Sequence, residues 1–213
     1  MIELKSFSFN PFQENTWLVW NENRDCVIID PGCESTQEEK KLLDFISSSN
    51  LKPIAIWLTH CHIDHVLGLN FCLQQWQIPY FLHQKETAQL RAVQAYAPSY
   101  GFHGFQMPEL QGKEICEGEI QLGNEKFSIL DVPGHSPGHV AFYHEESGIL
   151  ISGDVLFRES IGRTDLPGGD FKILEQSIRQ KIYTLPADTR ILPGHGPETT
   201  VGHEMKFNPF VPA

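Results

Sequence analysis

Short apolar runs alternate with stretches of helical periodicity along most of this chain. Apolar and β-branched runs of roughly four to eight residues, bounded by turn residues, are typical of buried strands. In the first half, this pattern predicts strands at residues 2–9, 16–20, 26–32, 53–59 and 78–82.

Helical patterns separate several of these strands. Ser35 is followed three residues later by Glu38, which is the spacing of a capping box, so a helix is predicted to begin there. Leu42, Leu43 and Ile46 then recur at helical spacing, which indicates one apolar face packed on a sheet. Two further helices are predicted at residues 66–76 and 85–97.

The second half begins with a segment, residues 98–118, that is rich in Gly, Pro and aromatic residues and has no steady period. It is predicted to be a long loop, and such loops either border a site or are plain surface. The remaining predictions are a hairpin over residues 119–134 turning at Gly123 and Asn124, strands at 139–144 and 148–154, a helix at 171–185 with Asp170 as its N-cap, and a last strand at 189–196.

Two groups of strands with interleaved helices predict an α/β fold, in which ligands gather where strands end in loops. The 213 residues contain no Pro/Gly/Ser linker, so a single domain spanning 1–213 is expected. Hydrophobic residues make up 40% of the chain and charged residues 20%, close to the averages for globular proteins.

Charge and composition narrow the function classes. A net charge of −11 without a basic run argues against nucleic-acid binding. The longest apolar runs are far shorter than the roughly 20 residues that cross a bilayer, and no signal-peptide pattern opens the chain, so no membrane association and a cytoplasmic location are expected. Five cysteines without CxxC spacing disfavour both a disulfide framework and a four-cysteine zinc site. No oligomeric state is predicted.

Side chains that can bind a metal are most closely spaced in the stretch THCHIDHVLG, at the end of the predicted strand 53–59. His60 and His62 are two residues apart at the end of an extended segment, so their side chains project to one side and can bind one ion. Asp64 and His65 follow as the chain bends into a helix, and they point to a second ion nearby. Alternation turns Cys61 away from both histidines, so a packing role is expected for it.

Three more candidate ligands each follow an apolar run and lie beside glycine: His135, Asp154 and His195. One ion is predicted to bind His60, His62 and His135. The other is predicted to bind Asp64, His65 and His195, with Asp154 reaching both. Imidazole and carboxylate suit zinc, and also iron or manganese. Two ions roughly 3.5–4 Å apart would share a hydroxide that is nucleophilic at neutral pH.

The remaining histidines are isolated in the sequence. A lone histidine is more often a surface residue or a core residue with its hydrogen bonds satisfied than a metal ligand. The ordinary roles are therefore expected for His83, His103, His139, His144 and His203.

The order HxHxDH, then a histidine, an aspartate and a final histidine, resembles the ligand pattern of the metallo-β-lactamase superfamily, and the likeness spans nearly the whole chain. The resemblance implies a four-layer αβ/βα sandwich with a dinuclear site at one edge. Four motifs are most similar to the glyoxalase II branch, the hydroxyacylglutathione hydrolases, and in particular to its short bacterial members. These motifs are THCHIDHVLG, PGHSPGH, SGDVLF and GRTDLPGGD.

This resemblance implies a thioester hydrolase with two Zn²⁺ ions, acting on a small-molecule substrate such as S-lactoylglutathione. Typical glyoxalase II enzymes have a C-terminal helical domain that holds glutathione, whereas only 18 residues follow His195 here, so the thiol carrier is expected to be held differently or to be another thiol. The alternative is a persulfide dioxygenase with one iron, for which His60, His135 and Asp154 are the matching positions.

Further roles follow as hypotheses. Asp64 is expected to orient or deprotonate the attacking water, and Asp154 to fix the spacing of the metals. Arg163 in GRTD either binds a substrate carboxylate, for which its planar fork is suited, or pairs with Asp165. The loop aromatics either cover the site or pack locally; they are Tyr96, Tyr100, Phe102 and Phe105.

Overall fold

The computed structural model describes residues 1–108 and 112–212, and the chain divides into two compact units, Met1–Ile115 and Cys116–Ala213. Each unit contains a six-stranded sheet and its own hydrophobic core. Whether the two units act as one domain, as expected from the sequence, stays a prediction.

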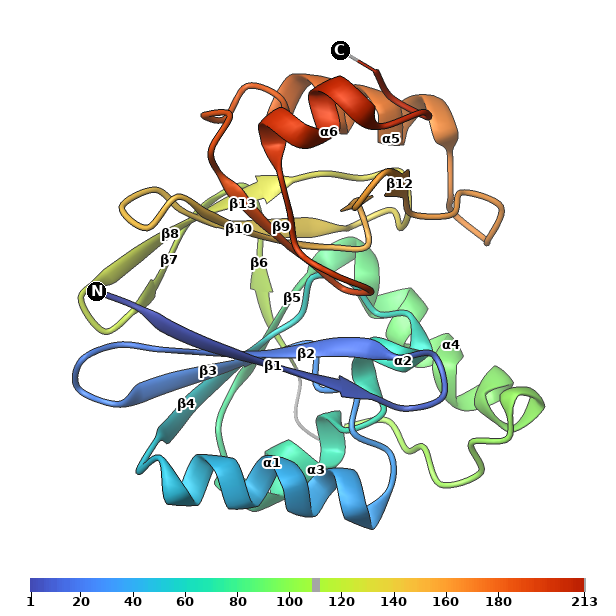
Figure 1. The fold of residues 1–213 in the computed structure, drawn as a ribbon. Coiled ribbons are helices and arrows are strands. Elements are labelled where there is room, and N and C mark those ends of the chain that lie inside the picture. Colours follow the sequence, from blue (N-terminus) through green and yellow to red (C-terminus); the bar gives the residue numbers. More distant parts are fainter. Residues whose placement is uncertain (109–111, 213) are drawn as a thin grey trace. The chain divides into compact units, whose positions relative to one another are not determined.

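The first unit is built on a mixed sheet with the strands in sequence order (Figure 1). The first three strands pair antiparallel, and β3, β4, β5 and β6 pair parallel, so helices make the crossovers. The strands are β1 (Glu3–Phe9), β2 (Glu14–Trp20), β3 (Asp25–Ile29), β4 (Lys52–Trp57), β5 (Tyr80–His83) and β6 (Lys113–Ile115).

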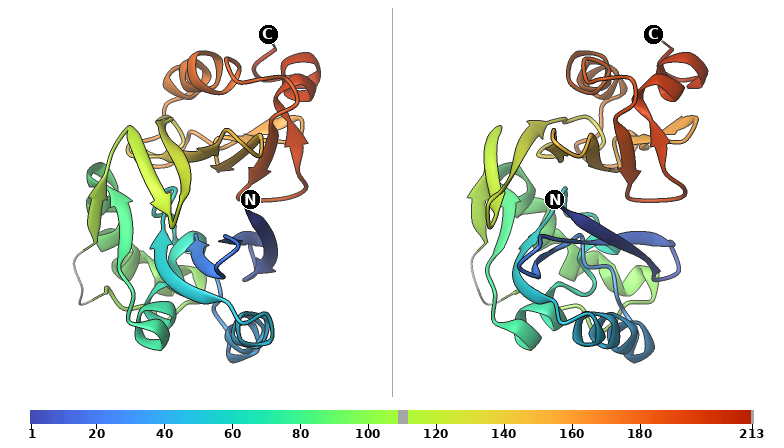
Figure 2. Two further views of the ribbon diagram at one scale, coloured as in Figure 1. Left: turned by 90° about the vertical axis from the view of Figure 1, so that its left-hand side faces the viewer. Right: turned by 60° about the vertical axis from the view of Figure 1, so that its left-hand side comes forward.

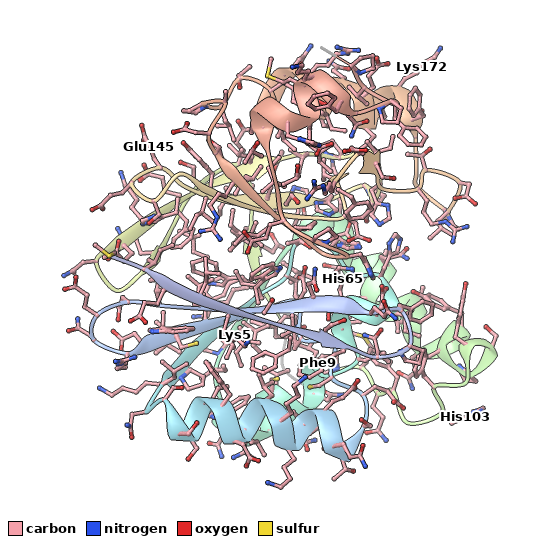
Figure 3. The ribbon with its side chains drawn as sticks, viewed as in Figure 1. Lys5, Phe9, His65, His103, Glu145 and Lys172 are labelled. Atoms are coloured by element: carbon pink, nitrogen blue, oxygen red, sulfur yellow. The ribbon has the colours of Figure 1, made fainter. Side chains whose placement is uncertain are left out.

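Helices α1 (Thr36–Ser48) and α3 (Leu69–Trp76) cover one face of this sheet (Figure 1). The predicted capping box is present, because Ser35 accepts from the Glu38 amide and Glu38 accepts from the Ser35 amide. The core lies between sheet and helices, where Phe9 points from β1 toward α1 (Figure 3). The other helices of the unit are α2 (Ile63–Val66), η1 (Gln84–Glu86), α4 (Thr87–Tyr96) and η2 (Ala97–Tyr100).

The helix predicted at 66–76 is divided, and its first turn begins earlier, as α2. In a continuous helix the Gly68 amide would donate to the Asp64 carbonyl oxygen. Instead the Gly68 amide donates to Pro31 O at 2.8 Å, and Asp64 O accepts from the Asn10 side chain at 3.0 Å. Tertiary hydrogen bonds therefore break the helix just after the predicted ligands.

The second unit contains a six-stranded sheet in the order β14-β13-β10-β9-β8-β7. The predicted hairpin is confirmed as β7 (Gly118–Leu122) and β8 (Glu125–Asp131). The remaining strands are β9 (Val140–His144), β10 (Ile149–Gly153), β13 (Arg190–Pro193) and β14 (Thr199–Thr200), with a small separate pair, β11 (Leu156–Phe157) and β12 (Ser160–Ile161).

Helix α5 (Phe171–Ser177), continued by the π-helical segment η3 (Ile178–Ile182), covers one face of this sheet together with α6 (Val201–Phe207) (Figure 2). Asp170 is the N-cap of α5, as predicted, and accepts from the Ile173 amide. The sequence prediction ended at the strand now seen as β13 and missed β14 and α6. Helix α6 is anchored by Glu204, which is fully buried and accepts from Thr199, Asn208 and the Glu159 amide.

The predicted loop at 98–118 is only partly irregular. It contains the end of η2 and the short strand β6, which pairs parallel with β5. Residues 109–111 of this prediction lie outside the described residues. Strand β6 was missed because its three residues, Lys-Glu-Ile, have no apolar run of their own and are extended by pairing with their neighbour.

Candidate metal centre

In the first unit, the segment after β4 carries the predicted HxHxDH cluster. His62 has extended backbone angles (φ −68°, ψ 154°) and precedes α2, whose single turn contains Asp64 and His65. The ring centroids of His60 and His62 lie 4.8 Å apart, and those of His60 and His65 lie 4.1 Å apart. The three imidazoles are therefore gathered at the end of one strand, and His65, labelled in Figure 3, comes from the short helix beside them.

Asp30, which follows β3, fixes the protonation of two of these imidazoles. Its carboxylate accepts from the Thr59 amide at 2.7 Å and from the Thr59 hydroxyl at 2.6 Å, and His65 Nδ1 lies 3.1 Å from Oδ2. Since a carboxylate only accepts, His65 donates from Nδ1. The Thr59 proton is used on Asp30, so His60 Nδ1, 3.0 Å from Thr59 Oγ1, donates too. Both rings are thereby left with an Nε2 lone pair, the form that binds a metal.

Two further buried acids surround this cluster. Glu14 is fully buried, accepts from Thr16 Oγ1 at 2.9 Å, and has Oε1 4.0 Å from His65 Nδ1; burial raises the pKa of its carboxyl group. Glu86 is also fully buried and accepts from the Cys61 amide at 2.9 Å. The Cys61 side chain lies in the core of the first unit, in line with the packing role predicted for it, and burial raises the pKa of its thiol.

Asn10 fastens the β1–β2 loop to the ligand segment. Its Nδ2 donates to Asp64 O and to Gly32 O, each at 3.0 Å, while its Oδ1 accepts from the Phe12 amide at 3.0 Å. The segments around Gly32 and Asp64 approach so closely that a Cβ on Gly32 would lie 2.1 Å from Glu14 Oε2 and 2.6 Å from Asp64 O. The backbone of Asp64 is therefore held by packing and by a hydrogen bond.

In the second unit, the three predicted ligands each follow a strand, as expected. His135 comes after β8, Asp154 directly after β10 and His195 after β13. Gly153 has a φ of 50°, a left-handed conformation that favours glycine, and it turns the chain at Asp154. His135 and Asp154 are buried, and His195 is partly exposed.

Asp154 lies between the two histidines of its unit. Its Oδ2 is 3.6 Å from His135 Nε2 and 3.6 Å from His195 Nε2. This separation is too long for a hydrogen bond. It is close to the roughly 3.4 Å that separates two ligand atoms when both bind the same tetrahedral ion at about 2.1 Å. His65 Nε2 and Asp64 Oδ2 in the first unit show a similar separation of 3.7 Å. These donor sets fit a metal ion.

Neutral groups hold the ligands of the second unit. His135 Nδ1 lies 2.7 Å from the Arg163 carbonyl oxygen, and because a carbonyl only accepts, His135 donates from Nδ1 and keeps its Nε2 lone pair. The Asp154 amide donates to His139 Nε2 at 3.1 Å. His139, for which an ordinary role was predicted, is a buried residue that positions a candidate ligand.

Arg163 pairs with Asp165 through two hydrogen bonds, Nε to Oδ1 and Nη2 to Oδ2, each of 2.7 Å. These bonds lower the pKa of Asp165 to about 2. The pairing is the alternative that the sequence had left open, and both side chains are exposed, so recognition of a substrate carboxylate by Arg163 stays a prediction.

Of the other isolated histidines, His144 and His203 each contact a carboxylate. His144 Nε2 is 3.1 Å from Glu125 Oε2, its Nδ1 accepts from the Ser147 amide, and its ring packs on Phe127. His203 Nε2 is 3.0 Å from Glu159 Oε1. These contacts fit the ordinary roles expected for them.

The folds and donor sets of the two units define a metal-binding α/β protein. The chain belongs to the metallo-β-lactamase superfamily, whose family profile matches residues 9–195, and the predicted metallo-β-lactamase fold is confirmed. Membership supports an enzyme of the metallo-hydrolase class and implies a dinuclear metal site, with the histidine-rich sets above as candidate ligands. Along the described residues, no helix has the length and apolar character needed to span a membrane.

Two curated relatives match nearly the whole chain. The probable metallo-hydrolase YqgX of Bacillus subtilis is 40% identical over 94% of this chain and 93% of its own length. The hydroxyacylglutathione hydrolase GloC of Haemophilus influenzae is 36% identical over the same shares of the two chains.

Two solved structures are similar over almost their full length. The BLEG-1 B3 metallo-β-lactamase is 37% identical, with a TM-score of 0.88, over 99% of this chain and 100% of that chain. TTHA1623, solved in a di-iron-bound form, is 40% identical, with a TM-score of 0.87, over 97% of this chain and 99% of that chain.

Proposed function

We propose that this protein is a thioesterase of the glyoxalase II type that cleaves S-(2-hydroxyacyl)glutathione or a related thiol ester. The observation that carries the metal chemistry is the contact of Nδ1 with an oxygen atom in each of His60, His65 and His135. Each is held through Nδ1 by an acceptor on its own unit, so each offers Nε2 to a metal. The substrate class is supported by the relative GloC, whose name is hydroxyacylglutathione hydrolase and which is matched over 93% of its length.

The proposed ligand sets are those expected from the sequence: His60, His62 and His135 for one ion, Asp64, His65 and His195 for the other, and Asp154 shared. The 3.6 Å separations from Asp154 Oδ2 to the imidazoles of His135 and His195 support sharing, because these histidines are assigned to different ions. Zinc is the proposed metal. The di-iron form of TTHA1623 makes iron the first alternative, and manganese suits the same donors.

Bound metal ions would supply a hydroxide at neutral pH and polarise the thioester carbonyl. The residues of the protein itself would hold and move a proton. Asp64, whose backbone is fixed by Asn10, would orient the attacking water and accept its proton on a carboxylate oxygen. The new carbon–oxygen bond replaces the carbon–sulfur bond, and the thiolate leaves.

The second proposed contact is between Arg163 and a carboxylate of the substrate. Because Arg163 already pairs with Asp165, the substrate would have to displace or share that partner. If the contact forms, Arg163→Ala raises KM for a glutathione thioester more than for a thioester without a carboxylate. Equal losses with both substrates reject direct recognition.

The deciding experiment is to purify the protein without added metal, quantify zinc, iron and manganese, and assay three substrates side by side. These are S-lactoylglutathione, glutathione persulfide with oxygen uptake, and a cephalosporin, included because BLEG-1 is named a B3 metallo-β-lactamase. Thioester turnover that dominates, with two ions per chain, is expected. Oxygen uptake with one iron per chain would favour the persulfide dioxygenase, and dominant cephalosporin turnover a β-lactamase.

The role of Asp64 has a separate test. Asp64→Ala is expected to lower kcat by at least about 10²-fold, because a positioned acid–base group contributes roughly 10²–10⁴-fold. Asp44→Ala is the matched control, since Asp44 is an exposed aspartate of α1 paired only with Lys40 in the described contacts. Full activity of Asp64→Ala with unchanged metal content would remove Asp64 from this role.

A further inference from the structure

The small hairpin β11–β12, with the residues that directly follow it, contacts all three candidate ligands of the second unit. Gly162, directly after β12, approaches so closely that a Cβ on it would lie 1.9 Å from Asp154 O and 2.9 Å from His135 Nδ1. The carbonyl oxygen of the next residue accepts from His135 Nδ1 at 2.7 Å. On β11, the Phe157 ring lies edge-on to the His195 ring, with the centroids 6.1 Å apart. Movement of the hairpin would therefore disturb contacts of all three ligands.

The hairpin has few internal contacts to fix its position. It forms a two-stranded sheet of its own with two paired residues on each strand, and an isolated pair of strands is marginal in water. Leu156 packs in the core of the second unit, but the turn at Arg158 and Glu159 is exposed. Glu159 has a φ of 55°, a conformation that a residue with a side chain keeps when its surroundings hold it. The turn therefore depends on contacts from outside the hairpin.

The end of helix α6 provides these contacts. The Glu159 amide donates to Glu204 Oε2 at 2.9 Å, and Asn208 Nδ2 donates to Ser160 O at 3.0 Å. Asn208 Nδ2 also donates to Glu204 Oε2 at 2.9 Å, so the two side chains hold each other. Glu204 and Asn208 are 0% and 1% exposed. Buried polar groups whose hydrogen bonds are satisfied make the segments that they join rigid.

We propose that Glu204 and Asn208 are positioning residues of the metal centre, because they fix the hairpin that orients the imidazoles of His135 and His195. Groups behind a metal ligand raise metal affinity by holding that ligand in its binding orientation. Since His135 and His195 are assigned to different ions, loosening the hairpin weakens the binding of both. This inference rests on the ligand sets of the proposed function and is independent of the substrate.

The first test is the zinc affinity of Asn208→Ala, measured by competition with a chelator. The variant lacks the donor to Ser160 O and to Glu204, and both ions are expected to bind roughly 10-fold more weakly. Glu204→Gln keeps an acceptor oxygen for the turn and should lose less. Tyr183→Phe is the matched control, because it also removes a hydrogen bond of the C-terminal segment, to Val211 O, but leaves the hairpin contacts in place. Its affinity should stay within about twofold of the wild type.

The second test reads His135 directly in the metal-free protein. Its Nδ1 proton is held by a backbone carbonyl and should give an NMR signal protected from exchange with water, assigned by its loss in His135→Gln. Asn208→Ala is expected to lose this protection, whereas Tyr183→Phe keeps it. A general loss of stability would affect both variants, so the difference between them reports on the hairpin.

Unchanged zinc affinity in a folded Asn208→Ala overturns the positioning role, and so does unchanged protection of the His135 proton. If Asn208→Ala does not fold, the wild type decides. A common opening of the hairpin predicts equal protection for the Glu159 amide and the His135 Nδ1 proton, and unequal protection overturns the role. A wild type that binds no zinc, iron or manganese would reject the proposed ligand sets instead, and the exchange measurement would still decide whether the hairpin holds His135.

Discussion

In the first unit the candidate ligands lie within residues 60–65, and the buried carboxylate of Asp30 holds His65 directly and His60 through Thr59. In the second unit the candidate ligands come from three separate strand ends and are held by a backbone carbonyl and an imidazole. Asp30 receives three hydrogen-bonding groups, from Thr59 and His65. His135 instead donates to Arg163 O, and the Asp154 amide donates to His139.

This difference has an energetic consequence. Buried carboxylates are costly unless they are satisfied, and removal of such a group leaves several donors without an acceptor. Neutral acceptors cost less to bury, and in the second unit the Arg163 carbonyl oxygen and His139 Nε2 are acceptors of this kind. Variants of the first unit should therefore lose more stability than equivalent variants of the second.

The largest effect is expected for Asp30→Ala. The Thr59 amide, the Thr59 hydroxyl and His65 Nδ1 would all lose their acceptor, and a loss of about 3–5 kcal/mol in the free energy of unfolding is expected. Urea unfolding of the metal-free protein measures it, with Asp44→Ala as the exposed control. A loss below about 1 kcal/mol would show that Asp30 does not hold this segment.

An intermediate effect is expected for His139→Ala. It leaves the buried Asp154 amide without its acceptor, which costs about 1–3 kcal/mol, and weakens metal binding by roughly 10–100-fold because Asp154 is no longer oriented. His139→Gln restores an acceptor and should recover part of both losses. Metal affinity by competition with a chelator checks this, and His139→Ala with unchanged affinity would contradict the positioning role.

A smaller, pH-dependent effect is expected for Glu14→Gln. Burial raises the pKa of Glu14 in the folded state, so its contribution to stability is present at pH values below the unfolded pKa and falls as pH rises through the folded one. The neutral variant does not titrate there. Its stability relative to the wild type should therefore increase from pH 5 to pH 8 in the metal-free protein. A constant difference across that range would contradict a raised pKa.

The smallest effect is expected for Tyr183→Phe in the second unit, away from the candidate ligands. Its hydroxyl donates to Val211 O at 2.8 Å, and losing this bond costs about 1 kcal/mol or less. Burial raises the pKa of Tyr183 to about 12, so the wild type loses stability as pH rises from about 10 to 12 and the variant loses less. Equal slopes in alkaline unfolding would contradict this.

The sequence predicts most of the regular structure, because strands and helices here follow local patterns. The Ser35–Glu38 capping box, the turn at Gly123 and Asn124, and the Asp170 cap are all local signals, and the structure confirms them. The division at Gly68 was missed because it depends on Pro31 and Asn10, which are distant in the sequence. Strand β6 and helix α6 likewise depend on tertiary contacts.

The candidate ligands are visible in the sequence because metal binding restricts residue type and places them after strands. The groups that position them are less visible. Asp30 also follows an apolar strand and lies two residues before a glycine, which is close to the signal that identified Asp154, so it could have been found. Asn10, Glu14 and His139 carry no such signal, since their roles arise only where distant segments pack together.

The close approach at Gly32 suggests how this chain can diverge. A methyl group there would collide with Glu14 Oε2, so Gly32→Ala alone displaces the acid and the Asp64 carbonyl behind it. A shorter residue at position 14 would remove one of these collisions. Substitutions at positions 14 and 32 should therefore be correlated among homologues, so that a larger residue at position 32 accompanies a smaller residue at position 14.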